Sequence, residues 1–123
     1  MGQQLRVLVV EDEPLVRALV TMAFEAEGYD VDTAADGAEA LAKACQQPPQ
    51  AIVLDLMMPV MNGWDFLDAW QCQPMSQAVP VVVMSAGGRQ EEQAPVDVQA
   101  YLTKPFNIDR LVATVTGLVT ARN

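Results

Sequence analysis

The chain has 123 residues, of which 51% are hydrophobic, and 16 acidic against 7 basic residues give it a formal net charge of −9. This length suits one domain with one core, so we expect residues 1–123 to form a single domain. Such an acidic chain is poorly suited to contact a phosphate backbone, which argues against direct binding of nucleic acid. No apolar run approaches the ~18 residues of a membrane span, and the N-terminus lacks a signal-peptide pattern. We therefore expect no association with a membrane.

Two residue types narrow the chemistry further. Cys45 and Cys72 fit no metal-binding spacing and are too few for a disulfide framework, so we interpret them as reduced packing residues of a cytoplasmic protein. The chain contains no histidine. Any step that needs an imidazole base or a phosphohistidine must therefore take it from a partner.

The first apolar run, Leu5–Val10, predicts a strand that leads directly into Glu11-Asp12-Glu13-Pro14. Pro14 suits the first turn of a helix, and the acidic residues before it suit the helix dipole. Helical spacing then relates a set of apolar residues: Leu15, Val16, Leu19, Val20 and Ala23. Gly28 is expected to end this helix.

A second strand and helix follow. Val31–Ala34 is the strand, and Asp36-Gly37-Ala38-Glu39 is similar to a capping box, which predicts a helix start. We expect Leu41, Ala42, Ala44 and Cys45 on the buried face of this helix.

The third strand is predicted at Ala51–Leu54, a short apolar run typical of a strand buried on both faces. Asp55 ends this run, and Met58-Pro59 followed by Asn62-Gly63 breaks regular structure at once. A helix is expected from about Trp64 to Trp70. Whether these tryptophans and Met75 pack in the core or lie partly exposed, the sequence leaves open.

The last third of the chain predicts two more strands. Val81–Met84 closes on Ser85, and Tyr101-Leu102-Thr103 is followed by Lys104-Pro105-Phe106. Between them, the polar segment Arg89–Gln99 contains Pro95 and supports only a short or frayed helix. Asn107 is expected to cap a final helix, and its apolar residues share one face: Ile108, Leu111, Val112, Val115, Leu118 and Val119.

Strands that alternate with helices over the whole length predict an α/β protein with a doubly wound parallel sheet and helices on both faces. The expected architecture is a flavodoxin-like (βα)5 fold with strand order 2-1-3-4-5, in which the first and third strands are neighbours. Ligands of such sheets bind outside the carboxyl ends of the strands.

Polar residues follow four of the predicted strands at that edge: Glu11 and Asp12, Asp55, Ser85, and Lys104. The three carboxylates would repel one another unless a cation lay between them. Oxygen ligands with room left for water and phosphate favour Mg²⁺. A hydroxyl and an ammonium complement a phosphoryl group. Each residue alone has a plain structural explanation, such as a helix start or a turn, but their common placement favours a functional site.

These residues also carry a family resemblance. The chain resembles the receiver domain of two-component response regulators, from about Leu5 to Val119. The resemblance depends on four motifs: Val-Val-Glu-Asp-Glu-Pro, Leu-Asp-Leu-Met-Met-Pro-Val-Met-Asn-Gly, Val-Met-Ser-Ala and Tyr-Leu-Thr-Lys-Pro-Phe. It implies phosphorelay signalling by a switch that is not a turnover enzyme.

The resemblance also implies roles for individual residues. Asp55 would be the phosphoacceptor, Asp12 and Asp55 would ligate Mg²⁺ directly, Glu11 would act through water, and the Met57 carbonyl would be a further ligand. Ser85 and Lys104 would contact the acyl phosphate, and Ser85 with Tyr101 would form the conformational switch. The phosphoryl donor would be a sensor histidine kinase or a histidine phosphotransfer protein, and the output would be an unknown protein or effector domain.

Two departures from the family pattern concern the output. The segment between Ser85 and Lys104 is shorter than usual, and Pro95 lies where a fourth helix is expected. No effector sequence follows Asn123, which implies either a stand-alone receiver, similar to chemotaxis regulators, or part of a longer protein.

Other functions remain as alternatives. A phosphorylation-independent scaffold would keep the fold for protein binding, although the intact site residues argue against it. An aspartyl-phosphate-forming phosphatase of the haloacid dehalogenase type carries a second Asp two residues after its nucleophile, where this chain has Met57. A flavodoxin-like nucleotide binder needs a phosphate-binding loop after the first strand, where Glu11 and Asp12 would repel phosphate.

Overall fold

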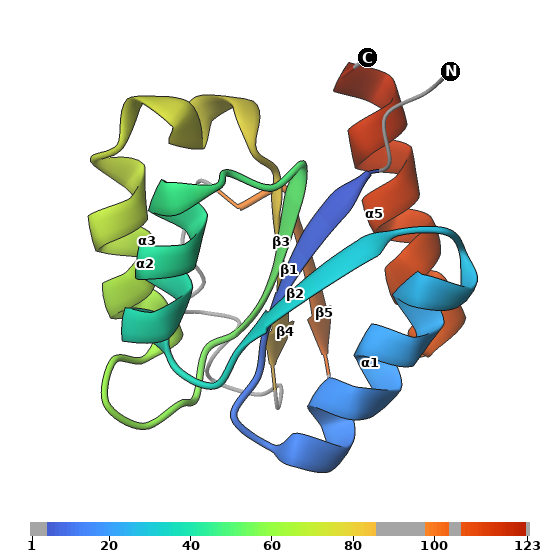
Figure 1. The fold of residues 1–123 in the computed structure, drawn as a ribbon, viewed down its shortest axis with the longest axis horizontal. Helices are drawn as coiled ribbons and strands as arrows, with labels where there is room; N and C mark the ends of the chain where they lie inside the picture. The colour runs from blue at the N-terminus through green and yellow to red at the C-terminus, as the bar shows by residue number, and fades with distance from the viewer. Residues whose placement is uncertain (1–4, 86–97, 104–106, 123) are drawn as a thin grey trace.

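The computed structural model describes residues 5–85, 98–103 and 107–122. Within these ranges the chain forms a five-stranded sheet with strand order β2-β1-β3-β4-β5, in which all neighbouring strands are parallel. Figure 1 shows α1 and α5 on one face of the sheet and α2 and α3 on the other. The predicted doubly wound fold and its strand order are confirmed.

The elements follow the alternation expected from the sequence. In chain order they are β1 (Arg6–Val10), α1 (Pro14–Ala26), β2 (Asp30–Ala34), α2 (Gly37–Gln46), β3 (Ala51–Asp55), α3 (Gly63–Gln71), the 3₁₀ helix η1 (Pro74–Ala78), β4 (Val81–Ser85), β5 (Ala100–Thr103) and α5 (Ile108–Arg122). The sequence did not predict η1. The helix expected within Arg89–Gln99 falls almost wholly outside the described residues.

Two apolar layers enclose the sheet, because successive side chains of a strand point to opposite faces. In β3, Ala51 and Val53 pack with α1 and α5, whereas Ile52 and Leu54 pack with α2 and α3. All five residues of β3 are buried. This central strand therefore carries Asp55 on a support that is covered on both sides.

Fewer apolar residues of α1 are buried than their helical spacing predicts. Val20 and Phe24 are buried and Val16 and Ala23 partly so, but Leu15 and Leu19 are 64% and 45% exposed. Helical spacing alone allows two neighbouring rows of side chains to face the sheet, and the contact with β1 and β2 selects one of them.

Two smaller burial predictions were wrong. In α2, Ala42 was expected to be buried but is exposed, whereas Ala40 and Ala44 are buried. Ala40 and Ala44 lie one helical turn apart on the face that meets the sheet, and Ala42 lies on the opposite face. Cys72 is free and exposed beyond the end of α3, whereas Cys45 is free and partly packed as expected. Among the aromatic residues, Trp70 is buried in the layer of α2 and α3, and Trp64 and Met75 pack only partly against it.

Capping side chains explain where most helices begin. The side chains of Asp36 and Asn62 accept hydrogen bonds from the backbone N–H groups of Glu39 and Asp65, and Asn107 accepts one from Arg110. Helix α1 differs, since Glu13 at its N-cap makes no side-chain capping bond. In the part of the chain that the structure describes, no helix has the length and apolar character needed to cross a membrane.

Candidate metal centre

Three carboxylates meet at the carboxyl edge of the sheet. The register pairs Val10 of β1 with Leu54 of β3, so Glu11 and Asp55 come next on adjacent strands. Glu11, Asp12 and Asp55 each offer a carboxylate oxygen, and these oxygens all lie within 4.8 Å of one another. Only 1% of Glu11 and 4% of Asp55 is exposed. The sequence prediction that these three residues converge is confirmed.

Such a cluster suits a hard divalent cation. Buried carboxylates in close proximity carry a large electrostatic cost unless an opposite charge compensates it. An all-oxygen set that provides only part of a coordination sphere fits Mg²⁺, which keeps several waters and binds through few carboxylates. The donor set of Glu11, Asp12 and Asp55 therefore fits the predicted metal.

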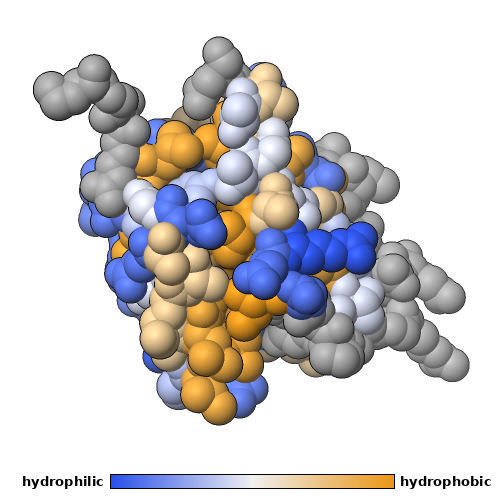
Figure 2. All heavy atoms as spheres, turned by 90° about the vertical axis from the view of Figure 1, so that its right-hand side faces the viewer, coloured by the Kyte–Doolittle hydropathy of each residue, from blue (hydrophilic) through white to orange (hydrophobic). Residues whose placement is uncertain are grey.

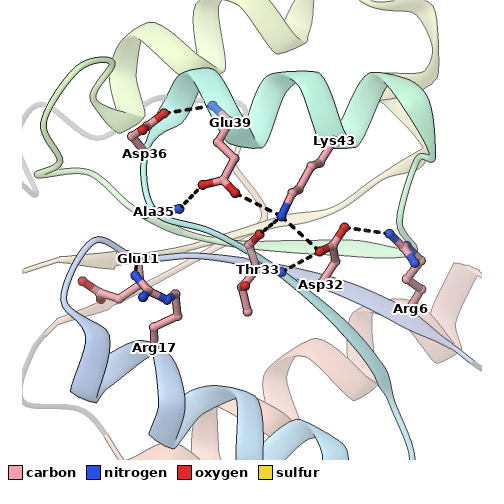
Figure 3. A network of polar contacts seen from close by, with 9 residues as sticks. All are labelled: Arg6, Glu11, Arg17, Asp32, Thr33, Ala35, Asp36, Glu39 and Lys43. Carbon is pink, nitrogen blue, oxygen red and sulfur yellow. Dashed lines mark hydrogen bonds and ion pairs between the residues drawn. The ribbon is translucent and has the colours of Figure 1, made fainter.

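The loop from β1 to α1 carries two of the three carboxylates. The Glu11 N–H donates to the Ala34 carbonyl at 3.0 Å, which ties the loop to the end of β2. The Glu13 N–H donates to the Glu11 carboxylate at 3.1 Å. From α1, Arg17 Nη1 donates to the Glu11 carbonyl at 2.9 Å and to the Asp12 carbonyl at 3.4 Å. Figure 3 shows Arg17 folded back toward Glu11.

The loop from β3 to α3 carries the third carboxylate, and close backbone contacts shape it. The Gly63 N–H donates to the Leu56 carbonyl at 2.9 Å, and a Cβ on Gly63 would lie 2.7 Å from the Asp55 carbonyl oxygen. The Gly37 N–H donates to the Met61 carbonyl at 2.8 Å. A Cβ on Gly37 would lie 2.5 Å from that carbonyl oxygen. Both positions need glycine because the neighbouring backbone occupies the space of any side chain.

A tight turn lies at the tip of this loop. The Met61 N–H donates to the Pro59 carbonyl at 2.7 Å, and Val60 between them has a φ of 66°. This is a γ-turn of the rarer hand, in a backbone region that β-branched residues seldom adopt. Backbone strain of this kind occurs where the surrounding structure constrains a loop. Beside the carboxylates, the Met57 N–H donates to Asp55 Oδ1 at 3.2 Å.

A second polar network stabilises the outer edge of the sheet (Figure 3). Arg6 and Lys43 pair with Asp32 at 2.9 and 3.4 Å, and Lys43 also pairs with Glu39 at 3.1 Å. Glu39 accepts the Ala35 N–H, which together with the bond from Lys43 lowers the pKa of Glu39 below its ordinary value of 4.5. Burial alone would lower the pKa of Lys43, but the hydrogen bond to Glu39 and the charge of Asp32 outweigh burial and raise this pKa.

The remaining predicted site residues are placed only in part. Ser85 ends β4, where its backbone pairs with Thr103 of β5, but its side chain is not described. Lys104 follows Thr103 and lies outside the described residues. The Met57 side chain is 55% exposed, and the role of its carbonyl stays a prediction. Tyr101 packs partly against the layer of α2 and α3, with a buried hydroxyl that has no described hydrogen-bond partner.

Large apolar side chains are exposed near this edge. Leu15, Leu19 and Met22 lie at successive turns of α1 and are 64%, 45% and 64% exposed. Across the site, Met57 and Val60 of the β3–α3 loop are 55% and 86% exposed. Figure 2 looks onto the side of the molecule that α1 and α5 form, and hydrophobic surface gathers toward its lower end, where α1 begins in Figure 1. Clustered exposed apolar residues are typical of surfaces that bind a partner.

The sequence prediction missed Arg17. A signal was available: Arg17 lies near the start of a helix, where the dipole disfavours a cation, in a chain with only 7 basic residues. A cation in such a place suggests a specific acceptor nearby. The backbone carbonyls of Glu11 and Asp12 are those acceptors.

Comparison with curated proteins finds relatives among bacterial transcriptional regulators. The chain is 42% identical to the transcriptional regulatory protein PrrA of Mycobacterium tuberculosis over 120 residues, covering 95% of this chain and 51% of PrrA. It is 36% identical to the probable transcriptional regulatory protein TcrX of the same species, covering 96% of this chain and 51% of TcrX. The chain therefore spans about half the length of these relatives.

Solved structures share the whole fold. The chemotaxis response regulator CheY4 of Vibrio cholerae has a TM-score of 0.86 and 34% identity, covering 94% of this chain and 99% of CheY4. The receiver domain of a sensor histidine kinase from Pseudomonas aeruginosa, solved with a magnesium ion in its active-site cleft, has a TM-score of 0.87 and 28% identity, covering 96% and 99% of the two chains. The sequence model of the response regulator receiver domain family matches residues 7–116 of this chain. The chain therefore belongs to this family of two-component signalling proteins.

Proposed function

We propose that Asp55 accepts a phosphoryl group in a Mg²⁺-dependent reaction and that residues 1–123 act as one receiver domain. The observation that carries this proposal is the convergence of three carboxylates from two loops, with Asp55 96% buried at the end of the central strand. An Asp55 oxygen would attack phosphorus, and the bond between phosphorus and the donor's leaving group would break, leaving its electron pair on that group. Receiver domains are signalling proteins, so this transfer would switch a state and not turn over a substrate.

Asp12 and Asp55 would hold Mg²⁺ directly, Glu11 would act through water, and the Met57 carbonyl would complete the protein ligands. Bound Mg²⁺ would neutralise charge that develops on the phosphoryl oxygens. Glu11 is buried, and the Ala34 carbonyl and the Arg17 guanidinium restrain its loop. The magnesium ion in the related kinase receiver domain supports this choice of metal.

Ser85 and Lys104 would contact the phosphoryl oxygens as hydroxyl donor and ammonium. Their places in the chain support these roles: Asp55 pairs with Met84, so Ser85 comes one residue further along β4, and Lys104 follows Thr103, the β5 partner of Ser85. Ser85 and Tyr101 would couple this contact to the surface beside β5. The Tyr101 hydroxyl is buried without a described hydrogen-bond partner, which is costly, and this supports a ring that can leave its packing site.

The phosphoryl donor would be a sensor histidine kinase or a histidine phosphotransfer protein in the cytoplasm. Since this chain has no histidine, the phosphohistidine must belong to the donor. The exposed apolar residues of α1 and of the β3–α3 loop flank the site and support a protein as donor. Free Cys45 and Cys72 suit the reducing cytoplasm. The output would pass to an unknown protein or effector domain, and transcriptional regulators among the relatives favour output through a DNA-binding part outside this chain.

A labelling experiment tests the proposal. Incubation with acetyl phosphate and Mg²⁺ should add one phosphoryl mass to the wild-type protein, and Asp55→Asn should gain none. Asp68→Asn is the control, because Asp68 is exposed on α3 and should leave labelling unchanged. Full labelling of Asp55→Asn, seen by intact-mass spectrometry, would contradict the assignment of the phosphoacceptor. Absence of label from the wild-type protein would favour a scaffold function.

A further inference from the structure

One arginine connects both acidic residues of the β1–α1 loop. Arg17 Nη1 donates to two consecutive backbone carbonyls, those of Glu11 at 2.9 Å and Asp12 at 3.4 Å, and Figure 3 shows the side chain reaching back from α1. We propose that Arg17 is a positioning residue that keeps this loop in the conformation that binds Mg²⁺. The inference rests on the proposed function, since it assigns the supporting contacts of the same metal centre.

The β1–α1 loop needs such a contact because the carbonyls of Glu11 and Asp12 accept no hydrogen bond within helix α1. The Arg17 N–H bonds to the Glu13 carbonyl at 2.9 Å, so the carbonyls of Glu11 and Asp12 lie before the first intrahelical bond. Pro14, at the first helical position, has no N–H to offer. Glu13 makes no side-chain capping bond. Glu11 is buried and Asp12 half-buried. A carbonyl that is shielded from water is costly without a hydrogen bond, and the guanidinium donates to both carbonyls at once.

Arg17 is also distinct among the basic residues near the sheet. Arg6 and Lys43 pair with acidic side chains of β2 and α2. Arg17 forms no ion pair with a carboxylate among residues 5–85, 98–103 and 107–122, and its described hydrogen bonds go to backbone oxygens. Its contacts therefore act on the course of the loop, and through the loop on where the side chains of Glu11 and Asp12 lie.

Two physical effects of Arg17 on metal binding have opposite signs. As a positive charge near the site, it repels a divalent cation, so its removal would tighten binding. As a support of the loop, it orders two ligand residues, so its removal would weaken binding. Outer-shell contacts of metal ligands typically change affinity by about 10- to 100-fold, whereas the field of a partly exposed guanidinium is reduced by water and salt. We therefore expect the positioning effect to dominate.

The test is calorimetric titration of Mg²⁺ into the full chain, with three variants. Arg17→Gln should raise the dissociation constant about tenfold. Arg17→Lys should raise it less, because an ammonium can still donate to one or both carbonyls. Arg6→Gln is the matched control: it removes the same charge from a half-buried, hydrogen-bonded arginine at the opposite end of β1 and should leave the dissociation constant unchanged. If the Gln variant does not fold by circular dichroism, the Lys variant carries the comparison.

A second measurement follows the loop without metal. Hydrogen exchange of the Glu11 and Glu13 amides should be faster in Arg17→Gln than in the wild-type protein, and unchanged in Arg6→Gln. Unchanged exchange, unchanged or tighter Mg²⁺ binding by Arg17→Gln, or an equal loss in Arg6→Gln would each overturn the inference. If the wild-type protein binds no Mg²⁺, the proposed metal centre fails, and the exchange rates still decide whether Arg17 holds the loop.

Discussion

The two loops that carry the carboxylates are constrained in different ways. One backbone bond, from the Glu11 N–H to the Ala34 carbonyl, ties the β1–α1 loop to β2, and its other described contacts use side chains: the Arg17 guanidinium contacts two of its carbonyls, and the Glu11 carboxylate accepts the Glu13 N–H. The β3–α3 loop depends on direct backbone approach at Gly37 and Gly63. Side-chain contacts can be exchanged for others of similar reach, whereas a backbone contact leaves no room for any added atom. We therefore expect the first loop to tolerate substitution and the second to resist it.

The largest expected effect follows from Gly63→Ala. The new Cβ would lie 2.7 Å from both the Asp55 carbonyl oxygen and the Leu56 Cα, and these backbone atoms cannot move without displacing β3. We expect a loss of about 3 kcal/mol in the free energy of unfolding, the upper part of the range for overpacking. Urea denaturation measures it. The control is Gly117→Ala in α5, where nothing lies within 4 Å of the added Cβ. Because alanine favours the helix more than glycine does, this variant should gain about 1 kcal/mol in the free energy of unfolding at most.

Gly37→Ala should have a smaller effect of the same sign. Its Cβ would meet the Met61 carbonyl oxygen at 2.5 Å and the Met61 Cγ at 2.8 Å. The side-chain atom can move away, but the carbonyl is the acceptor of the Gly37 N–H and would have to give up that bond. We expect a loss of about 2 kcal/mol, again by urea denaturation. A variant as stable as the wild-type protein would show that this loop is more compliant than its glycine contacts indicate.

The other loop offers a substitution that should stabilise the protein. Glu13 occupies the N-cap of α1 with extended backbone angles but makes no capping bond, and its side chain is exposed. Glu13→Ser supplies a short acceptor for the first free N–H groups of the helix and should add about 1 kcal/mol to the free energy of unfolding. Asn62→Ala at the capped α3 should lose a similar amount. The comparison fails if Glu13→Ser destabilises the protein in thermal melts.

The smallest expected effect concerns pH. The folded-state pKa of Glu39 lies below its ordinary value of 4.5, so the stability that Glu39 contributes is present above that value and is lost as the pH falls through the lower, folded-state pKa. Because the Glu39 side chain is 42% exposed, solvent screening limits the contribution to below about 1 kcal/mol. Melts of the wild-type protein and Glu39→Gln should differ near neutral pH and converge in acid. A difference that persists in acid would mean that the negative charge of Glu39, which the Ala35 N–H and Lys43 stabilise, is not its cause.

Much of this molecule was predictable from local patterns. Short apolar runs alternating with helical spacing indicated the parallel sheet, because a parallel strand must be followed by a crossover. The strand order was expected from the flavodoxin-like architecture, in which the first and third strands are neighbours. The position of Asp55 at the end of a run buried on both faces placed it at the ligand-binding edge. Asp36 and Asn107 marked helix starts correctly, since a cap depends on atoms only two or three residues away, whereas the cap at Asn62 was found only in the structure.

Burial was less predictable, because it depends on which neighbour a helix meets. Leu15 and Leu19 share the spacing of Val16 and Val20 yet remain exposed. Ala42 was expected in the interior, but its neighbour Ala40 lies there. An apolar side chain is compatible with either face of a helix, and only the packed sheet selects one.

The sequence by itself determined the fold class, which follows from the alternation of strands and helices. It also determined the meeting of Glu11, Asp12 and Asp55, because these residues follow two neighbouring strands of a parallel sheet. Tertiary structure alone decided how the two loops around them are supported. Arg17 donates to the carbonyls of Glu11 and Asp12, and Gly37 at the start of α2 donates to the carbonyl of Met61 in the β3–α3 loop. Motifs along the chain record which residue follows which. They do not record contacts between backbone atoms of separate loops, which exist only once the sheet has brought the loops together.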